Sequence, residues 1–221
     1  MATVYDMAKL YLANTERIND DSASELLHQL PEERRLRISC MKNGDAQRLS
    51  LAAGALLLYA LRCAGLPDTA AVSHTEQGKP FFPDYPSFHF NLSHSGIWAA
   101  CAVGGEELGV DIQKIVSVTG SVRNRCLALS ELRWLESLDE NHRDAGFCRV
   151  WSLKEALLKA EGKGLRRWPG EIQILDEQGR ICRSDRVFRE FHIPGYTVAV
   201  CCLNECIEEQ PQIVDLQDLL C

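Results

Sequence analysis

The chain contains two similar apolar segments, Gly96-Ile-Trp-Ala-Ala-Cys-Ala-Val103 and Gly195-Tyr-Thr-Val-Ala-Val-Cys-Cys202. Each begins at a glycine and continues in small and β-branched residues, which predicts a turn followed by a buried strand. A long helical pattern precedes the strands of each half, from about residue 45 to 64 and from about residue 145 to 162. Two such units in succession predict an α+β fold made of two similar halves.

The boundary between the halves is predicted near Gly104-Gly105. This gives an N-terminal α+β half, residues 1–104, and a C-terminal α+β half, residues 105–221, which carries most of the motifs described below. No flexible linker separates them in the sequence, so the halves are expected to pack tightly. A cleft between two packed halves is the natural place for a functional site.

Composition narrows the class of protein. The 221 residues are 46% hydrophobic and 25% charged, which indicates a globular protein rather than a disordered or fibrous one. The net charge of -7 argues against a general nucleic-acid binder. The most apolar stretch, Leu49–Leu61, is too short to span a bilayer, and residues 1–14 lack the pattern of a secretion signal. These features predict a cytoplasmic protein with no membrane partner.

The ten cysteines form no C-x-x-C pattern, and several lie within apolar runs. They are interpreted as free thiols in a reducing compartment. The group Cys201, Cys202 and Cys206 has a zinc site as its alternative, although its spacing matches no usual zinc motif.

The segment Leu108-Gly-Val-Asp-Ile-Gln113 has the alternation of a strand, on which Asp111 and Gln113 share a face. An aspartate among apolar neighbours is costly to bury unless it binds a metal, another cation or backbone donors. The ordinary alternative is an aspartate that caps a turn or faces solvent.

The segment Trp151–Gly164 has the period of a helix. Glu155 and Lys159 are four residues apart, so both side chains project beside one apolar stripe, as at a crevice. Two ordinary interpretations compete: Ser152 with Glu155 fits a capping box, and Glu155 with Lys159 fits a helix ion pair. The glycines of a phosphate-binding P-loop are missing.

Three polar residues of the N-terminal half also stand out. Ser93 and His94 are adjacent, so on an extended chain their side chains diverge and cannot form a nucleophile–base pair. His94 could instead donate to an anion. Arg48 begins a helix that is expected to be mostly buried, and a buried guanidinium requires an anion, either a carboxylate or a ligand phosphate.

In combination, these motifs resemble the signature of the 4'-phosphopantetheinyl transferases. The resemblance covers roughly residues 30–164, and its blocks occur in the family's order: Gly78-Lys-Pro80, Asn91-Leu-Ser-His-Ser-Gly96, Gly109-Val-Asp111, and Trp151-Ser-Leu-Lys-Glu-Ala156 with Lys159 and Gly162-Lys-Gly164. Residues 165–221 carry no usable motif. The length is similar to that of the monomeric, surfactin-type subgroup. This implies two α+β halves packed as a pseudo-twofold dimer, with the active site in the cleft between them.

The resemblance implies an enzyme that transfers 4'-phosphopantetheine from coenzyme A to a serine hydroxyl of an apo carrier protein and releases 3',5'-ADP. It also implies Mg²⁺, or Mn²⁺ in its place, with Asp111, Glu155 and Gln113 as the metal residues. Asp111, Glu155 and Lys159 are the implied catalytic residues. Glu155 would take the serine proton and Lys159 would stabilise the leaving phosphate, whereas Lys154 lies on another face of the helix.

The resemblance further assigns the coenzyme A-binding residues, namely Arg48, Lys79, Ser93, His94 and Lys159. Two positions depart from the family's pattern. Many surfactin-type members have a glutamate where this chain has Gln113, and Glu33 stands near the position of a phosphate-binding lysine. Compensation for that lysine is expected from a nearby arginine, which is Arg34, Arg35 or Arg37.

The expected partner is an apo carrier protein of fatty-acid, polyketide or peptide-synthetase type, and the enzyme is expected to be a monomer that binds no nucleic acid. Carrier proteins are usually acidic, and this chain is acidic too, so a local basic patch is expected to guide docking. The candidates are Arg123, Arg125, Arg166 and Arg167. Two other functions stay open: a degenerate member that binds coenzyme A or carrier without transfer, and a Mg²⁺-dependent phosphohydrolase of small nucleotides.

Overall fold

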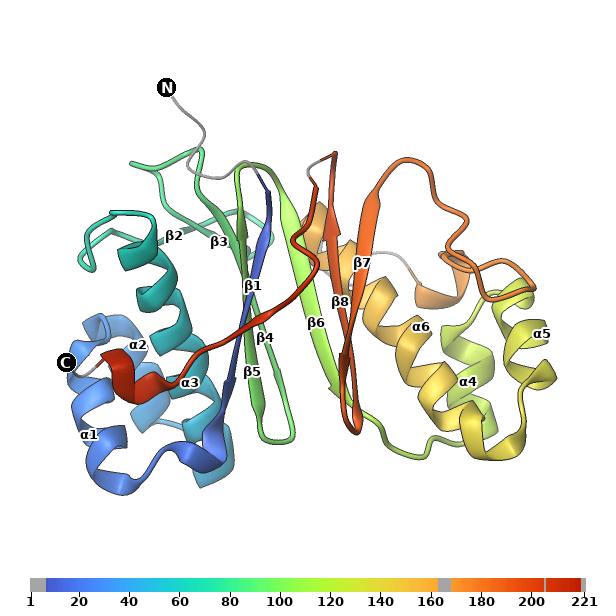
Figure 1. The fold of residues 1–221 in the computed structure, drawn as a ribbon, viewed down its shortest axis with the longest axis horizontal. Helices are drawn as coiled ribbons and strands as arrows, with labels where there is room; N and C mark the ends of the chain where they lie inside the picture. The colour runs from blue at the N-terminus through green and yellow to red at the C-terminus, as the bar shows by residue number, and fades with distance from the viewer. Residues whose placement is uncertain (1–6, 163–167, 205, 220–221) are drawn as a thin grey trace.

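The computed structural model describes residues 7–162, 168–204 and 206–219. These residues form two mixed α+β halves, with the sheets at the centre and helices on either side (Figure 1). The first sheet has the strand order β4-β5-β1-β9, and the second has the order β6-β8-β7. Neighbouring strands are antiparallel except for β1 and β9, which are parallel. The mixed α+β fold predicted from the sequence is therefore confirmed.

The strands of the first sheet are β4 (His89–Ser95), β5 (Trp98–Gly104), β1 (Lys9–Asn14) and β9 (Gln212–Ile213). The second sheet consists of β6 (Leu108–Lys114), β8 (Tyr196–Cys202) and β7 (Val187–Ile193). A small antiparallel pair in the N-terminal half is made of β2 (Ser73–His74) and β3 (Pro80–Phe81).

The helices pack on the outer faces of the sheets (Figure 1). Those of the N-terminal half are α1 (Asp20–Gln29), α2 (Glu32–Ser39) and α3 (Gly44–Cys63). Those of the C-terminal half are α4 (Gly120–Cys126), α5 (Leu129–Ser137) and α6 (Glu140–Glu161). No helix in the described part of the chain is long and apolar enough to cross a membrane.

Three apolar cores hold these layers together. One lies between α3 and the first sheet, and another between α6 and the second sheet. The third lies between the two sheets, where Leu10 and Leu12 of β1 share a buried cluster with Val110 and Ile112 of β6. Because apolar residues of both sheets are removed from water there, the two halves pack as one body.

The start of α3 differs from the sequence-based expectation. The sequence predicts Asp45 as the N-cap, but the cap is Asn43. The Asn43 side-chain oxygen accepts hydrogen bonds from the backbone N–H groups of Asp45 and Ala46, at 2.8 and 3.2 Å. Asn43 satisfies these two donors, so the helix begins earlier than Asp45 alone would allow.

From the sequence, Ser130 is expected to cap a helix that runs to Leu138, and Glu171–Leu175 is expected to form a strand. Both expectations are wrong. Ser130 is not the cap of α5; its hydroxyl donates to Leu175 O at 3.0 Å, while Glu131 accepts from the backbone N–H of Ala128 at 2.8 Å. Residues 171–175 are not a strand. Glu171 is the last residue of a short 3-10 turn. Leu175 forms a single bridge with Ile181, because the Glu131 side chain accepts hydrogen bonds from the backbone N–H groups of Ile174 and Leu175.

The last described segment departs from a simple division at residue 104. Residues 206–219 return to the N-terminal half, where β9 pairs with β1 (Figure 1). Val214 and Leu216 are buried in the core of that half. This segment pairs with the edge that β1 would otherwise leave open, so the end of the C-terminal half of the sequence completes the first sheet.

The two sheets are joined where side chains of β4 accept hydrogen bonds from the backbone of β6. β4 alternates, so Asn91, Ser93 and Ser95 share one face. Their side-chain oxygens accept hydrogen bonds from every second backbone N–H of β6 at 3.0, 3.3 and 3.0 Å; the donors are Val110, Ile112 and Lys114. The block Asn91–Ser95 therefore fixes the position of β6 against β4.

Gly109 allows β6 and α6 to approach closely. A Cβ atom there would lie 2.1 Å from Ala156 O and 2.4 Å from Ala160 N, both of which belong to a helix backbone. We expect Gly109→Ala to lower the free energy of unfolding by about 1–3 kcal/mol, as overpacking does. Denaturant unfolding measures this, with Gly120→Ala as the control because a Cβ there meets nothing within 4 Å. Equal unfolding midpoints for the two variants would contradict the prediction.

Candidate active site

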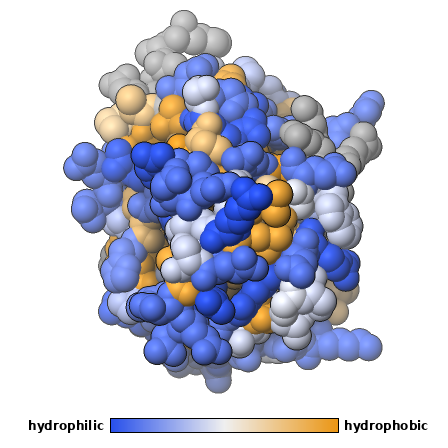
Figure 2. All heavy atoms as spheres, turned by 90° about the vertical axis from the view of Figure 1, so that its right-hand side faces the viewer, coloured by the Kyte–Doolittle hydropathy of each residue, from blue (hydrophilic) through white to orange (hydrophobic). Residues whose placement is uncertain are grey.

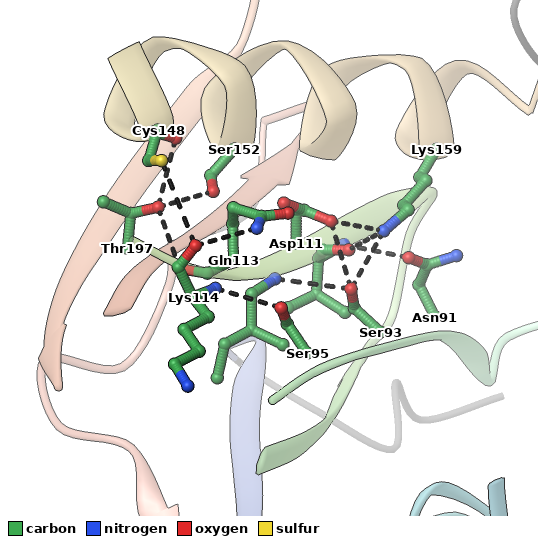
Figure 3. A network of polar contacts seen from close by, with 12 residues as sticks. Asn91, Ser93, Ser95, Asp111, Gln113, Lys114, Cys148, Ser152, Lys159 and Thr197 are labelled. Atoms are coloured by element: carbon green, nitrogen blue, oxygen red, sulfur yellow. Dashed lines mark hydrogen bonds and ion pairs between the residues drawn. The ribbon is translucent and has the colours of Figure 1, made fainter. Parts of the chain in front are cut away.

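Asp111 is the buried acid of β6, beneath α6 (Figure 3). Its Oδ1 accepts hydrogen bonds from Lys159 Nζ at 2.7 Å and from Ser93 Oγ at 3.1 Å. Its Oδ2 is buried and has no hydrogen-bond partner among the described residues. Because an unpaired buried carboxylate oxygen is costly, this atom fits a bound cation.

Lys159 extends from α6 toward β6 and β4 (Figure 3). In addition to Asp111, its ammonium donates to Ser93 Oγ and to Val110 O, each at 3.0 Å. Lys159 therefore forms its ion pair with Asp111 on β6 and not with Glu155 on its own helix. The lysine side chain is 28% exposed, so it is partly open to a ligand while it compensates the charge of Asp111.

Glu155 lies on α6 one turn before Lys159 and is half-buried. Burial raises the pKa of its carboxyl; the Lys159 charge lowers that pKa, and the Asp111 charge raises it. Two carboxylates that repel each other in a partly buried site favour a divalent cation between them. The capping box does not form, because Ser152 lies well inside α6 and its hydroxyl hydrogen-bonds with Thr197 Oγ1 at 2.8 Å.

Gln113 follows Asp111 on the same face of β6. Its Nε2 donates to Lys114 O at 2.8 Å, which leaves its carbonyl oxygen on the side of Asp111 (Figure 3). Among the described residues there is no group of three or more His, Cys, Asp and Glu side chains placed to hold a metal ion. A cation at this place would therefore have the two carboxylates of Asp111 and Glu155, with amide or water oxygens to complete its shell.

The cysteine group considered as a zinc site is divided by the fold. Cys201 and Cys202 are buried neighbours on β8, so their side chains point to opposite faces of the sheet, and Cys206 is exposed. The nine cysteines within the described ranges form no disulfide bonds.

A pocket of about 240 Å³ opens beside the Asp111–Lys159 pair. Its walls come from both halves: the Gln77–Pro80 loop and Asn91 on one side, and Glu155, Leu158, Lys159 and Gly162 on the other. The pocket thus joins three of the sequence blocks at one place. The sequence analysis did not predict a role for Asn91. Its spacing of two residues from Ser93 on a strand could have indicated that both side chains lie on the same face.

Lys79 lines this pocket, but its ammonium is engaged by protein oxygens. It pairs with Glu107 and donates to Ala160 O at 3.1 Å and Leu108 O at 3.4 Å. The stem of Lys79 packs on Gly162, where a Cβ would lie 3.0 Å from Lys79 Cδ. Lys79 therefore connects its loop to the end of α6 and the start of β6.

The other residues assigned to coenzyme A lie at different distances from the pocket. Ser93 belongs to the Asp111–Lys159 network, whereas His94 lies on the opposite face of β4. Burial of part of its ring lowers the pKa of His94, as do the positive charges of Lys159, Arg34 and Arg37. Arg48 is not brought to the pocket: its guanidinium binds Asp20 Oδ1 at 2.7 Å and Ile18 O at 2.9 Å.

A larger cavity of about 480 Å³ lies in the N-terminal half, and it shares Pro80 with the smaller pocket. Arg34 and Arg37 line it together with apolar side chains of α3 and β4. Arg34 lies against Gly54 and donates to Ser50 O at 2.9 Å, but its buried Nε has no partner among the described residues. Burial, together with the positive charge of Arg37, lowers the pKa of Arg34 to about 10. These features fit an anion-binding position.

Four of the residues considered from the sequence, Lys163, Gly164, Arg166 and Arg167, lie outside the described residues.

The site residues that the sequence did not indicate are two acids that form ion pairs with lysines. Glu107 pairs with Lys79, and Glu131 pairs with Lys154 at 2.6 Å. No spacing rule connects these pairs, since they join different elements.

Comparison with known proteins identifies the family of the chain. Residues 107–201 match the family model described as the 4'-phosphopantetheinyl transferase superfamily. The chain is 32% identical over 156 residues to the 4'-phosphopantetheinyl transferase Sfp of Bacillus subtilis, which covers 67% of this chain and 70% of that protein. The chain belongs to the 4'-phosphopantetheinyl transferase superfamily.

Further relatives support the same assignment. The 4'-phosphopantetheinyl transferase psf-1 of Bacillus pumilus is 32% identical over 164 residues, 70% of each chain. The L-aminoadipate-semialdehyde dehydrogenase-phosphopantetheinyl transferase of Xenopus laevis is 32% identical over 141 residues, 55% of this chain and 46% of that protein. These matches support a phosphopantetheinyl transferase of the surfactin-type subgroup.

Proposed function

We propose that this transferase moves 4'-phosphopantetheine from coenzyme A to a serine hydroxyl of an apo carrier protein, in a Mg²⁺-dependent reaction that releases 3',5'-ADP. The observation that carries the proposal is the convergence of Asp111, Glu155 and Lys159 beside one pocket, with an unpaired buried oxygen on Asp111. This arrangement suits an anionic ligand and a hard cation together.

We propose that the N-terminal half, residues 1–104, and the C-terminal half, residues 105–221, are related by a pseudo-twofold axis and hold coenzyme A between them. The long helix over a sheet in each half supports this, as do the pocket walls supplied by both. The enzyme would act as a monomer in the cytoplasm, where free thiols persist, and would bind neither nucleic acid nor membrane.

Asp111, Glu155 and Gln113 would hold the Mg²⁺, or Mn²⁺ in its place. When bound, the ion neutralises negative charge on the pyrophosphate oxygens as the bond breaks. Its binding can be measured apart from activity, by the electron paramagnetic resonance signal of free Mn²⁺.

Glu155 would accept the proton of the attacking serine hydroxyl, a role for which a carboxyl with a raised pKa is suited. The serine oxygen forms a bond to the phosphorus that bears pantetheine. The bond from that phosphorus to the bridging oxygen breaks, and 3',5'-ADP leaves with the electron pair. Lys159, held by Asp111, Ser93 and Val110, would place its positive charge beside the oxygens on which this charge gathers.

We propose that the cavity of the N-terminal half accommodates the nucleotide end of coenzyme A, with Arg34 in the role of the lysine that Glu33 replaces. We expect Arg34→Met to weaken coenzyme A binding by about tenfold or more, the usual loss for a charge-assisted hydrogen bond. Isothermal titration measures this, and Arg35→Met is the matched control because Arg35 does not line the cavity. Equal dissociation constants for the two variants would remove Arg34 from the site.

The proposed reaction differs from its alternatives in when 3',5'-ADP appears. We expect 3',5'-ADP to be released only when coenzyme A and an apo carrier are both present. Phosphate release from coenzyme A without carrier would instead support the phosphohydrolase. Binding of coenzyme A without release, across several carriers, would support the degenerate binding protein.

A further inference from the structure

Glu107 directly precedes β6 and binds the ammonium of Lys79, a residue that lines the pocket beside Asp111. The ammonium has two further contacts, since it donates to Ala160 O at 3.1 Å and to Leu108 O at 3.4 Å. Glu107, Leu108 and Ala160 do not line that pocket, whereas Lys79 does. An ammonium has three N–H donors, so in this arrangement all three are used by protein oxygens and none is left for a ligand.

Among these three partners of Lys79, Glu107 is the one that can move aside. The oxygens of Leu108 and Ala160 belong to the backbone of β6 and α6, which strand pairing and helical hydrogen bonds hold in place. Glu107 contacts Lys79 through a side chain that is 56% exposed, while the Lys79 side chain is only 12% exposed. The Glu107 carboxylate also repels any anion that approaches Lys79. An anionic ligand can therefore bind Lys79 only by displacing Glu107.

A second pocket gives the displaced carboxylate room. It also has a volume of about 240 Å³, it shares Lys79 and Pro80 with the first pocket, and Glu107 and His89 are on its wall. His89 Nδ1 lies 3.7 Å from Glu107 Oε1. Burial lowers the pKa of His89, the Glu107 charge raises it, and the Lys79 charge lowers it. When a ligand anion compensates the charge of Lys79, that lowering weakens, and the imidazole becomes a better partner for Glu107.

Ion pairs on the outer surface differ from the Lys79–Glu107 pair. Arg133 of α5 and Glu177 are 2.6 Å apart, with side chains 58% and 49% exposed. They belong to the C-terminal half, whose outer side is mainly hydrophilic (Figure 2). Water competes for both partners of such an exposed pair, so the pair contributes little. Lys79 is shielded from water and lines two pockets, so its ion pair competes with a ligand rather than with solvent.

We propose that Glu107 is an internal anion that sets the affinity for coenzyme A. It occupies Lys79 in the free enzyme, moves toward His89 when the pyrophosphate binds, and returns when 3',5'-ADP leaves. The inference rests on the proposed function, because it takes the ligand of the pocket to be coenzyme A. No covalent bond changes in this step, since one ion pair replaces another. The free energy of the Lys79–Glu107 pair is lost on binding, so the enzyme holds both coenzyme A and 3',5'-ADP less tightly than Lys79 alone would allow.

The variant Glu107→Gln tests this role, because glutamine keeps the size of the side chain and removes its charge. We expect the dissociation constants of coenzyme A and 3',5'-ADP, measured by isothermal titration without carrier, to fall by about threefold or more, as for a partly exposed ion pair. Glu208→Gln is the matched control, since Glu208 pairs with Lys9 at 3.3 Å and both side chains are 39% exposed. Unchanged or larger dissociation constants in Glu107→Gln would overturn the inference. Failure of the unmodified enzyme to modify a carrier would contradict the proposed function instead.

A double-mutant cycle shows whether Glu107 acts through Lys79. In a Lys79→Met background the lysine charge is gone, so Glu107→Gln is expected to change the dissociation constant of coenzyme A by less than about twofold. A fall as large as that in the unmodified enzyme would mean that Glu107 acts as a remote charge, and it would overturn the exchange of partners at Lys79. Circular dichroism confirms that the Lys79 variants are folded before the titrations.

Discussion

Replacement of Glu155 by glutamine is expected to lower kcat for phosphopantetheine transfer by about 10²–10⁴-fold, the usual contribution of a positioned general base. Glutamine has nearly the same shape, so α6 and the pocket remain intact. It cannot accept the serine proton, and it leaves Asp111 as the single carboxylate for the cation. The effect therefore combines the loss of proton transfer with weaker metal binding.

Two measurements separate these contributions in the Glu155→Gln variant. Single-turnover transfer gives the rate of the chemical step, and the signal of free Mn²⁺ gives metal affinity without activity. Glu25→Gln is the control, because Glu25 is an exposed acid on α1. A Glu155→Gln enzyme that keeps more than a tenth of the transfer rate would show that another group takes the proton.

Replacement of Lys154 by methionine is expected to lower the free energy of unfolding by about 3–5 kcal/mol, because it leaves the Glu131 carboxylate buried without its partner. Both side chains are 0% exposed, so water cannot take the place of the missing ammonium. The carbonyl oxygens of Cys126 and Pro169 lose a donor as well. Urea unfolding followed by circular dichroism measures the loss.

The double variant Lys154→Met/Glu131→Leu is expected to recover most of this stability, since it removes the unpaired charge. Lys42→Met, at an exposed position, serves as the control and should leave the unfolding midpoint unchanged. A single variant Lys154→Met as stable as this control would contradict a tight buried pair. An equal loss in the single and double variants would mean that packing, not the unpaired charge, causes the destabilisation.

The spacing of residues along single strands and helices correctly predicted which side chains share a face. Alternation along residues 108–113 placed Asp111 and Gln113 on one face, and helical spacing placed Glu155 and Lys159 on one side of α6, as the structure has them. The same periodicities could not show that Lys159 pairs with Asp111, because these residues are 48 positions apart and meet only when α6 packs on β6. Gly109 is the sequence feature that permits this contact.

The contacts made by the basic residues, including those proposed to bind the nucleotide, were the hardest to predict from the sequence. Arg48 has the expected position at the start of α3, but Asp20, from the neighbouring α1, takes its charge. Arg34 turns inward because Gly54 leaves room beside α3, a steric detail that composition and spacing do not contain. Lys154 is similar: its partner Glu131 is on another helix, so the helical pattern indicated only that the lysine faces away from Glu155.

The central claim is the transfer itself, and the intact mass of an apo carrier protein tests it most directly. The carrier is incubated with coenzyme A, Mg²⁺ and the enzyme, beside samples with EDTA and with the Glu155→Gln variant. The account predicts a gain of one phosphopantetheine group per carrier, which EDTA abolishes and the variant slows by orders of magnitude. No gain on carriers of both the fatty-acid and peptide-synthetase types, with coenzyme A still bound to the enzyme, would contradict it.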